Sequence, residues 1–294
     1  MIIPEYGTYD GIGLAELVRR NEVSPADLVD SAIDVIERLN PQVNCVVQVL
    51  RDHALAEIEA GLAPGPFHGV PFLVKEFGMH FKGMVASAGS RLASGYRNNQ
   101  DTVMMQRCRA AGLVTVGTTT LPEMAINAST ESLLYGPTRN PWNLDYAAGG
   151  SSGGAGAAVA SGMVPIAHAN DGAGSIRIPG ACNGAVAMKV SRGRTPGGPD
   201  FGVRDSATML DLLAGPDAGY FYTAPEPRRG FLSAAVTLPK PLRIGVIEHL
   251  PGACDTAAEN LARLADTRRL LEDLGHHCVP LQLDYDAAAF DRST

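Results

Sequence analysis

Short apolar segments alternate with segments of helical periodicity along most of the chain, and this alternation constrains the fold more than any other feature. One helix is predicted to start at Ser24, a good N-cap, because Pro25 follows at the first helical position and Asp27 lies in the first turn. Further helices are predicted over residues 52–62, 102–111, 152–161 and 255–274, and strands over residues 43–50, 70–74, 113–117, 164–169, 242–247 and 277–283. The alternation predicts an α/β fold with a twisted, mostly parallel (mixed) sheet and helices on both faces.

Charge and composition limit the partners. The formal net charge is −7 and no Lys/Arg cluster offsets it, so we expect no nucleic acid partner. The longest weakly polar stretch, residues 153–167, consists largely of Gly and Ala and contains Ser161 and Pro165, so we expect no membrane span. The N-terminus lacks a basic region before an apolar core, which indicates no signal peptide. Five scattered cysteines without a C-x-x-C pair indicate free thiols, so the sequence predicts a cytoplasmic protein.

Three short segments contain residues suited to catalysis. In the first, the apolar run Gly69 to Val74 ends at Lys75, which is either a buried lysine at a strand end or an ordinary solvated one. The second, Gly149 to Gly154, has two serines among four glycines. It is either a flexible loop or a backbone held in conformations that favour glycine. The chain contains 33 glycines, about 11 % against a norm of about 7 %, and many fall between residues 136 and 202.

The third segment runs from Asp171 to Pro179 and follows a predicted strand. A turn of small residues after a strand can direct several backbone N–H groups into one space, as in an oxyanion hole. The seven histidines are dispersed, and neither they nor the cysteines show metal-ligand spacing, so we expect no metal and no cofactor. No phosphate-binding G-x-x-x-x-G-K-[ST] motif is present.

Taken together with the segment Gly136 to Trp142, the three segments resemble the amidase signature family in both order and spacing. The resemblance extends from about Leu14 to about Pro280. The sequence of the segment Asn170 to Ser175 is most similar to that of bacterial amidases that hydrolyse cyclic amides and aryl amides. The resemblance implies an amidase that hydrolyses the C–N bond of a small carboxamide or cyclic amide to an acid and ammonia or an amine.

The resemblance also implies a role for each site residue. Ser175 is expected to be the nucleophile that forms an acyl-enzyme, and Ser151, joined to Gly150 by a cis peptide bond, to bridge it to the general base Lys75. The N–H groups of Gly172, Ala173, Gly174 and Ser175 are expected to form the oxyanion hole.

Three further residues are expected to support this triad. Ser152 is expected to hydrogen-bond Ser151. Asp171 and Arg177 are expected to form a structural ion pair, with contact between Arg177 and a substrate carboxylate as the alternative.

A lysine base requires a shifted pKa. Free lysine has a pKa of about 10.4, so only about one part in 2500 is neutral at pH 7. Burial disfavours the ammonium form and lowers the pKa, and the apolar run before Lys75 is consistent with such burial.

The sequence departs from the family in two places. Relatives usually have an extra stretch near residues 202–203, and they continue well beyond residue 294. We therefore expect a single domain over 1–294 that lacks this insert and the C-terminal part, with an opened site in which water reaches Lys75 and limits its pKa shift. Exposed strand edges would favour a homodimer. Two alternatives remain: a truncated or degenerate non-catalytic member, and the amidase subunit of a tRNA-dependent amidotransferase.

Overall fold

The computed structural model describes residues 2–191, 210–212, 214, 225–249 and 255–283. The chain divides into two compact units, Met1–Ala235 and Val236–Thr294. The expected single domain over 1–294 therefore stays a prediction, and the junction near residues 202–203 lies outside the described residues.

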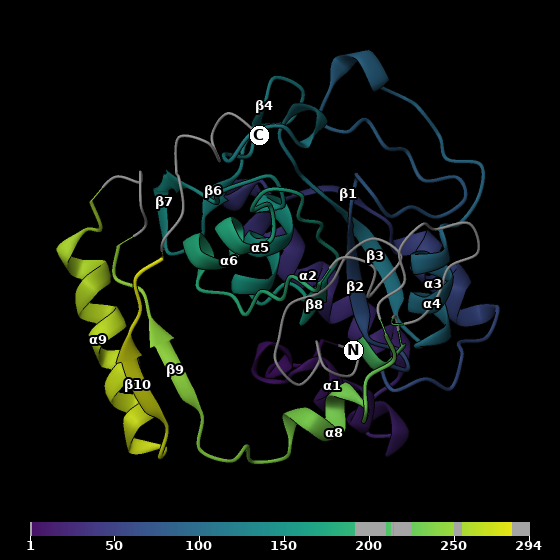
Figure 1. Cartoon of the computed structure of the whole chain (residues 1–294). Helices are drawn as coiled ribbons and strands as arrows, with labels where there is room; N and C mark the ends of the chain where they lie inside the picture. The colour runs from purple at the N-terminus through teal and green to yellow at the C-terminus, as the bar shows by residue number, and fades with distance from the viewer. Residues whose placement is uncertain (1, 192–209, 213, 215–224, 250–254, 284–294) are drawn as a thin grey trace. The chain divides into compact units, whose positions relative to one another are not determined.

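The first unit contains a mixed sheet with helices on both sides of it (Figure 1). Its helices are η1 (Tyr6–Thr8), α1 (Gly11–Arg19), α2 (Pro25–Val43), α3 (Arg51–Glu59), η2 (Arg91–Ala93), α4 (Val103–Ala110), η3 (Glu123–Ala125), α5 (Gly153–Ala160), α6 (Arg177–Asn183) and α8 (Phe231–Ala235). Its strands are β1 (Val46–Val49), β2 (Pro71–Lys75), β3 (Val114–Thr119), β4 (Glu131–Ser132), β5 (Gly136–Pro137), β6 (Arg139–Asn140), β7 (Asn143–Ala147) and β8 (Ile166–Ala167). Figure 1 shows α2, α5 and α6 on one side of β2 and β3, and α3 and α4 on the other. The predicted α/β class and mixed sheet are confirmed.

The main sheet has the order β1-β3-β2-β8. Strand β2 runs parallel to β3 and β8, whereas β1 runs antiparallel to β3. All five residues of β2 are buried, as expected for a central strand covered on both faces. The register sets Lys75 beside Thr119 at one end of the sheet.

Helix α2 begins where the sequence predicts. The Ser24 side chain accepts from the Asp27 N–H, and the Asp27 carboxylate accepts from the Ser24 N–H, which completes a capping box. The helix extends further than expected, to Val43, and Asn44 ends it in the left-handed conformation at φ 53°. For this reason β1 starts at Val46 rather than at residue 43.

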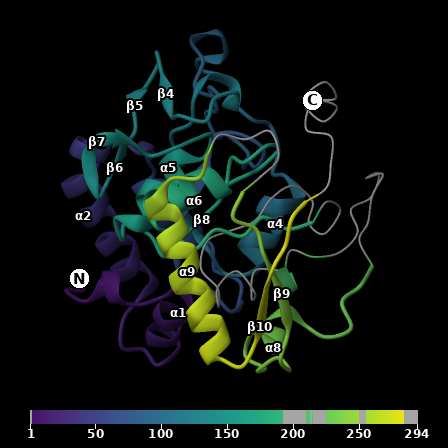
Figure 2. The ribbon, with the colours of Figure 1, turned by 60° about the vertical axis from the view of Figure 1, so that its left-hand side comes forward.

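Helix α5 depends on its small residues. A Cβ atom on Gly154 would lie 2.5 Å from the Thr120 backbone nitrogen and 2.7 Å from the Cys45 carbonyl oxygen. Only glycine allows this close approach, which brings the start of α5, with Ser151 and Ser152 just before it, to the end of the sheet where β2 finishes. In Figures 1 and 2 the hairpin of β6 and β7 lies beside α5 and α6, and the Trp142 indole N–H donates to the Asn183 carbonyl at 2.7 Å.

The second unit is a βαβ arrangement of β9 (Arg243–Val246), α9 (Ala258–Asp273) and β10 (His277–Pro280). The two strands are parallel, with His277 beside Arg243, and α9 packs on β10. Gly275, at φ 88°, follows the end of α9, as the sequence predicts.

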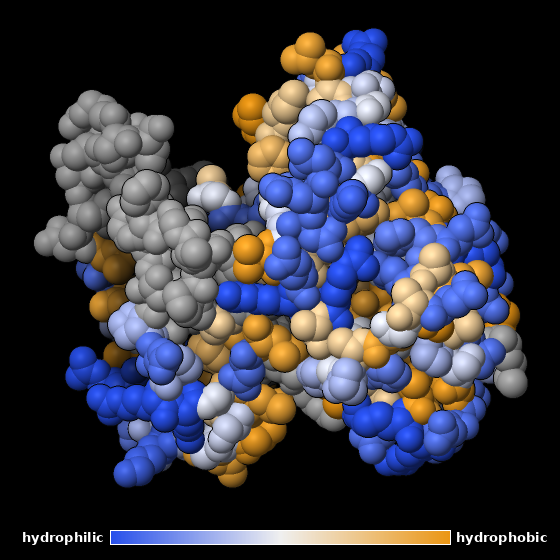
Figure 3. Space-filling model, turned by 90° about the vertical axis from the view of Figure 1, so that its right-hand side faces the viewer, coloured by the Kyte–Doolittle hydropathy of each residue, from blue (hydrophilic) through white to orange (hydrophobic). Residues whose placement is uncertain are grey.

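Apolar and hydrophilic residues alternate over the surface that Figure 3 shows. Among the described residues, Leu92, Ile126 and Leu133 are each more than four-fifths exposed. No helix in the described part of the chain combines the length and hydrophobicity of a membrane span.

Candidate active site

Lys75 is the last residue of β2, and its side chain is fully buried. Its Nζ lies 2.9 Å from Ser151 Oγ, 2.9 Å from Ser152 Oγ and 2.6 Å from Asn170 Oδ1. The fold thus brings Lys75 together with Ser151 and Ser152, the two serines of the Gly149 to Gly154 segment. It adds Asn170, whose role the sequence analysis missed.

Burial lowers the pKa of Lys75 from 10.5 to about 7, although the Asp171 carboxylate acts in the opposite direction. The expectation that water reaches Lys75 and weakens this shift is therefore wrong. The side chains around the amine are Ser151, Ser152 and Asn170, all within the first 175 residues. Segments beyond residue 294 are not needed to bury it.

Ser151 and Ser152 immediately precede α5, and the Gly150–Ser151 peptide bond is cis. Ser152 was expected to hydrogen-bond Ser151, but its hydroxyl accepts from Lys75 and donates to the Asn170 carbonyl at 3.3 Å. Ser152 therefore supports the site through its hydrogen bond with the Lys75 amine. The Ser152 N–H donates to the Ser175 carbonyl at 3.1 Å, which ties the two serine segments together.

Thr130 supports this motif from the loop before β4 and was missed by the sequence analysis. Its buried hydroxyl donates to the Gly149 carbonyl at 2.8 Å and accepts from the Gly153 N–H at 3.2 Å. A lone threonine in a loop carries no signal in a single sequence, because its partners lie about 20 positions away.

The Asp171 carboxylate organises the segment that carries Ser175. Its side chain is fully buried and makes two hydrogen bonds with the Arg177 guanidinium, at 2.9 and 3.0 Å, which forms the expected ion pair. It also accepts from the N–H groups of Gly174, Ile176 and Arg177. Burial favours a higher pKa for Asp171, but these hydrogen bonds outweigh it and hold the pKa well below its usual range.

The hydrogen bond from the Gly174 N–H to Asp171, at 2.7 Å, occupies one of the four N–H groups expected to form the oxyanion hole. Within the described residues, the N–H groups of Gly172, Ala173 and Ser175 have no hydrogen-bond partner. Gly172 and Ala173 are exposed and Ser175 is half-buried, so this side of the cluster opens to solvent. Ser175 is linked to the cluster through its backbone carbonyl rather than through its hydroxyl.

Glu76 is a second buried charge beside the site that the sequence analysis missed. Its carboxylate accepts from Gln48, Thr118, Ser87 and Tyr135 at 2.8 to 3.3 Å. These partners come from β1, β3 and two loops, so the carboxylate fixes the backbone that follows Lys75.

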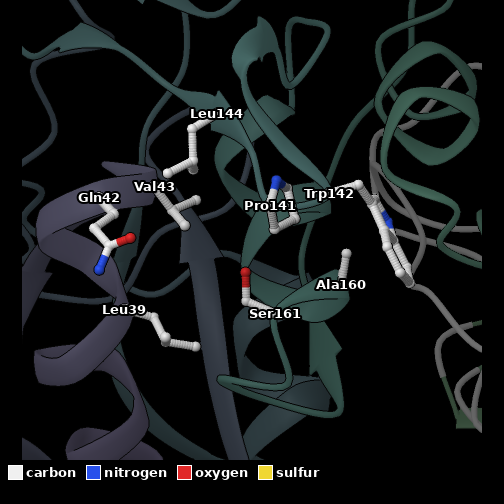
Figure 4. Close-up of a pocket in the computed structure, with 8 residues that line it drawn as sticks. All are labelled: Leu39, Gln42, Val43, Pro141, Trp142, Leu144, Ala160 and Ser161. Atoms are coloured by element: carbon white, nitrogen blue, oxygen red, sulfur yellow. The ribbon is translucent and has the colours of Figure 1, made fainter.

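A cavity of about 260 Å³ lies at the opposite end of α5 from the serines (Figure 4). It is lined by Leu39, Gln42, Val43, Pro141, Trp142, Leu144, Ala160 and Ser161. In Figure 4 the aliphatic side chains of α2 and β7 lie on one side and Trp142 on the other. Because α5 spans eight residues, about 12 Å of helix separates this cavity from Ser151, and the two sites are distinct.

Comparisons with known proteins agree with this geometry. A sequence model of the Amidase family matches residues 27–199. The 6-aminohexanoate-cyclic-dimer hydrolase of Paenarthrobacter ureafaciens is 39 % identical over 287 residues, 91 % of this chain and 58 % of that protein. An acylamidase of Rhodococcus erythropolis is 35 % identical over 283 residues, 89 % of this chain and 59 % of that protein.

Solved structures give the same result. A 6-aminohexanoate cyclic dimer hydrolase superimposes with a TM-score of 0.90 at 37 % identity, over 95 % of this chain and 61 % of that one. A bacterial aryl acylamidase of the amidase signature family superimposes with a TM-score of 0.88 at 29 % identity, over 97 % and 64 %. The chain spans less than two thirds of the length of each of these relatives. With the family model matching more than half of its residues, this chain belongs to the amidase signature family.

Proposed function

We propose that this chain hydrolyses the C–N bond of a small carboxamide or cyclic amide through an acyl-enzyme on Ser175. The observation that carries the proposal is the fully buried Lys75 amine, 2.9 Å from Ser151 Oγ. With a pKa of about 7, about half of the Lys75 side chains are neutral at pH 7, so a base is present without a histidine or a metal ion.

Acylation then follows a two-serine relay. Neutral Lys75 takes the proton of Ser151, Ser151 takes the proton of Ser175, and the Ser175 oxygen attacks the carbonyl carbon. The N–H groups of Gly172, Ala173 and Ser175 are the donors we assign to the resulting oxyanion, since the Gly174 N–H is bound to Asp171. When the C–N bond breaks, the leaving nitrogen receives the proton held by Lys75 through Ser151.

Deacylation repeats the relay with water. A water molecule gives a proton to Lys75 through Ser151 and attacks the carbonyl carbon of the ester. The bond between this carbon and Ser175 Oγ then breaks, and the proton returns to Ser175. The products are a carboxylic acid and ammonia or an amine. The exposed backbone at Gly172 and Ala173 is the side from which substrate and water would enter.

The proposed substrate is uncharged. Arg177 was the candidate partner for a substrate carboxylate, but its Nε and one terminal nitrogen bind Asp171. Two of the similar proteins are named for hydrolysis of a cyclic dimer and of an acyl amide, which supports small cyclic or acyl amides. One component of a glutamyl-tRNA(Gln) amidotransferase from Thermotoga maritima is also similar, but at 27 % identity, below the 37 % of the cyclic dimer hydrolase structure.

The predicted homodimer and cytoplasmic location stay predictions. The oligomeric state in solution distinguishes a monomer from the predicted homodimer. Light scattering of the purified chain measures this directly.

Labelling with an alkyl fluorophosphonate tests the proposed function, because the reagent reports an activated serine without requiring the natural substrate. We expect mass spectrometry to find the adduct on Ser175 and Ser175→Ala to abolish it. Release of ammonia or amine from a simple carboxamide, an acetanilide and a cyclic diamide then identifies the substrate class. A folded wild-type protein that resists labelling between pH 6 and pH 10 would contradict the proposal and favour the degenerate member.

A further inference from the structure

The side-chain amide of Asn170 is held at both ends. Its Oδ1 accepts from Lys75 Nζ at 2.6 Å, and its Nδ2 donates to the Phe77 carbonyl oxygen at 2.7 Å. A carbonyl oxygen can only accept, so Nδ2 must face Phe77 and Oδ1 must face the amine. This orientation of Asn170 therefore follows from the hydrogen bonds.

The backbone beside Asn170 is shaped to admit this amide. Gly78 has φ +91°, and a Cβ atom on it would lie 2.4 Å from Asn170 Nδ2. Any other residue at position 78 would occupy the space that the amide fills and would be strained at this φ. The turn after β2 thus leaves space for the Asn170 amide in the position where it contacts Lys75.

Counting protons around Lys75 Nζ gives Asn170 a specific role. A neutral amine has two N–H groups and one lone pair, and three side-chain oxygens surround it. Asn170 Oδ1 can only accept a hydrogen bond. The Ser152 hydroxyl uses its one proton to donate to the backbone carbonyl oxygen of Asn170, so it accepts from the amine. These two groups take both N–H bonds, and the lone pair is left for the Ser151 hydroxyl.

We propose that Asn170 is a positioning residue that directs the lone pair of neutral Lys75 toward Ser151. The proposal rests on the proposed function, in which Lys75 removes a proton from Ser151. Asn170 does this with a neutral acceptor, so it orients the amine without adding a negative charge that would favour the ammonium form.

The other groups around Lys75 are consistent with this role. From β3 and the start of α5, the neighbours Thr119, Ser151 and Ser152 are uncharged. The turn after β2 carries the Glu76 carboxylate, which accepts hydrogen bonds from its own donors. One of these donors is Tyr135, in the loop between β4 and β5, whose pKa burial raises to about 12.

The segment that follows β8 carries His168 and Asp171. Burial and the charge of Lys75 lower the pKa of His168 to about 3, so His168 is neutral, and Asp171 is paired with Arg177. An ionised carboxylate at position 170 would be an unpaired anion in direct contact with the amine.

Two substitutions test the proposal with opposite expected signatures. Asn170→Asp keeps the shape and the acceptor but adds charge, whereas Asn170→Ala removes the acceptor. Asn99→Asp adds the same charge at an exposed position and serves as the control. The chain contains four lysines, so a ¹³Cε-lysine NMR titration resolves Lys75 against the exposed Lys82, Lys189 and Lys240. The rate of fluorophosphonate labelling against pH is the second measurement.

For Asn170→Asp we expect the Lys75 titration midpoint and the rise in labelling to move at least one pH unit upward. Labelling at pH 7 then falls at least about fivefold and recovers at high pH. For Asn170→Ala we expect no upward shift but a plateau at least tenfold lower, and for Asn99→Asp no change. A merely structural role would not give these opposite changes. An Asn170→Ala plateau equal to wild type, or an unmoved midpoint in Asn170→Asp, would overturn the inference.

Failure of the proposed function gives a different result. If wild type is never labelled, the acyl-enzyme proposal fails and the assigned role of Asn170 fails with it, although the NMR titration still measures how position 170 affects Lys75. If wild type is labelled at Ser175 and the Asn170 variants match it, only the inference about Asn170 fails.

Discussion

Replacing Lys75 by methionine should change the stability of the protein relative to wild type by an amount that depends on pH. In the folded chain the Lys75 pKa is about 7, against 10.5 for an unperturbed lysine, because the amine is buried. Between these two values the unfolded chain binds a proton that the folded chain does not. Stability therefore rises with pH across this window, and the destabilisation by Lys75 is complete below about pH 7 and absent above about pH 10.5.

The magnitude follows from the shift. About 3.5 pKa units correspond to roughly 5 kcal/mol of destabilisation at low pH. At pH 9 only about 1.5 units remain, or roughly 2 kcal/mol. The gap between Lys75→Met and wild type should therefore shrink by roughly 2–3 kcal/mol from pH 6 to pH 9. Methionine leaves the side-chain oxygens of Ser151, Ser152 and Asn170 without their hydrogen-bond partner, at about 1–3 kcal/mol for each buried group left unsatisfied. That cost does not depend on pH, so it cancels in the comparison.

Urea unfolding followed by circular dichroism, on both proteins at pH 6, 7.5 and 9, measures this gap. The two proteins share every other titrating group, and neither Asp171, with its lowered pKa, nor His168, at about 3, titrates in this range. A gap that stays constant or widens toward pH 9 would refute the argument that burial sets the pKa of Lys75.

Three further predictions test the site and its support. Ser151→Ala should abolish fluorophosphonate labelling at Ser175, whereas Ser152→Ala should slow it about tenfold, since Ser152 contributes only one hydrogen bond to Lys75; equal losses in a labelling time course would contradict this division. Arg177→Ala should lower the free energy of unfolding by about 1–3 kcal/mol and slow labelling, because it leaves the buried Asp171 carboxylate without its cation; an unchanged urea midpoint would mean that the backbone donors suffice. Gly154→Ala should cost about 2 kcal/mol or more, because its Cβ would lie 2.5 Å from the Thr120 nitrogen, while the control Gly7→Ala meets nothing within 4 Å; equal melting temperatures for the two variants would show that α5 can shift away from β3.

The sequence by itself determined the features that depend on short stretches of chain. The capping box of Ser24 and Asp27 marks the start of α2, because its partners are three residues apart. The apolar run before Lys75 predicts a buried strand, observed as Pro71–Lys75, because a central strand is covered on both faces. The order of the glycine-rich and serine-rich segments also predicted the family, and the family model that matches residues 27–199 confirms it.

Only the tertiary structure decided what surrounds the amine. Lys75 meets Ser151 across 76 positions and Asn170 across 95, and no local pattern encodes such pairs. The same holds for the antiparallel placement of β1, for Thr130 bracketing the serine motif and for the Gly174 N–H turning to Asp171. A hydrogen-bond partner is set by where side chains from distant segments converge, and a pKa by how completely they exclude water. Both depend on packing, which is why the sequence identified Lys75 as a candidate base but only the fold showed that its own neighbours bury it.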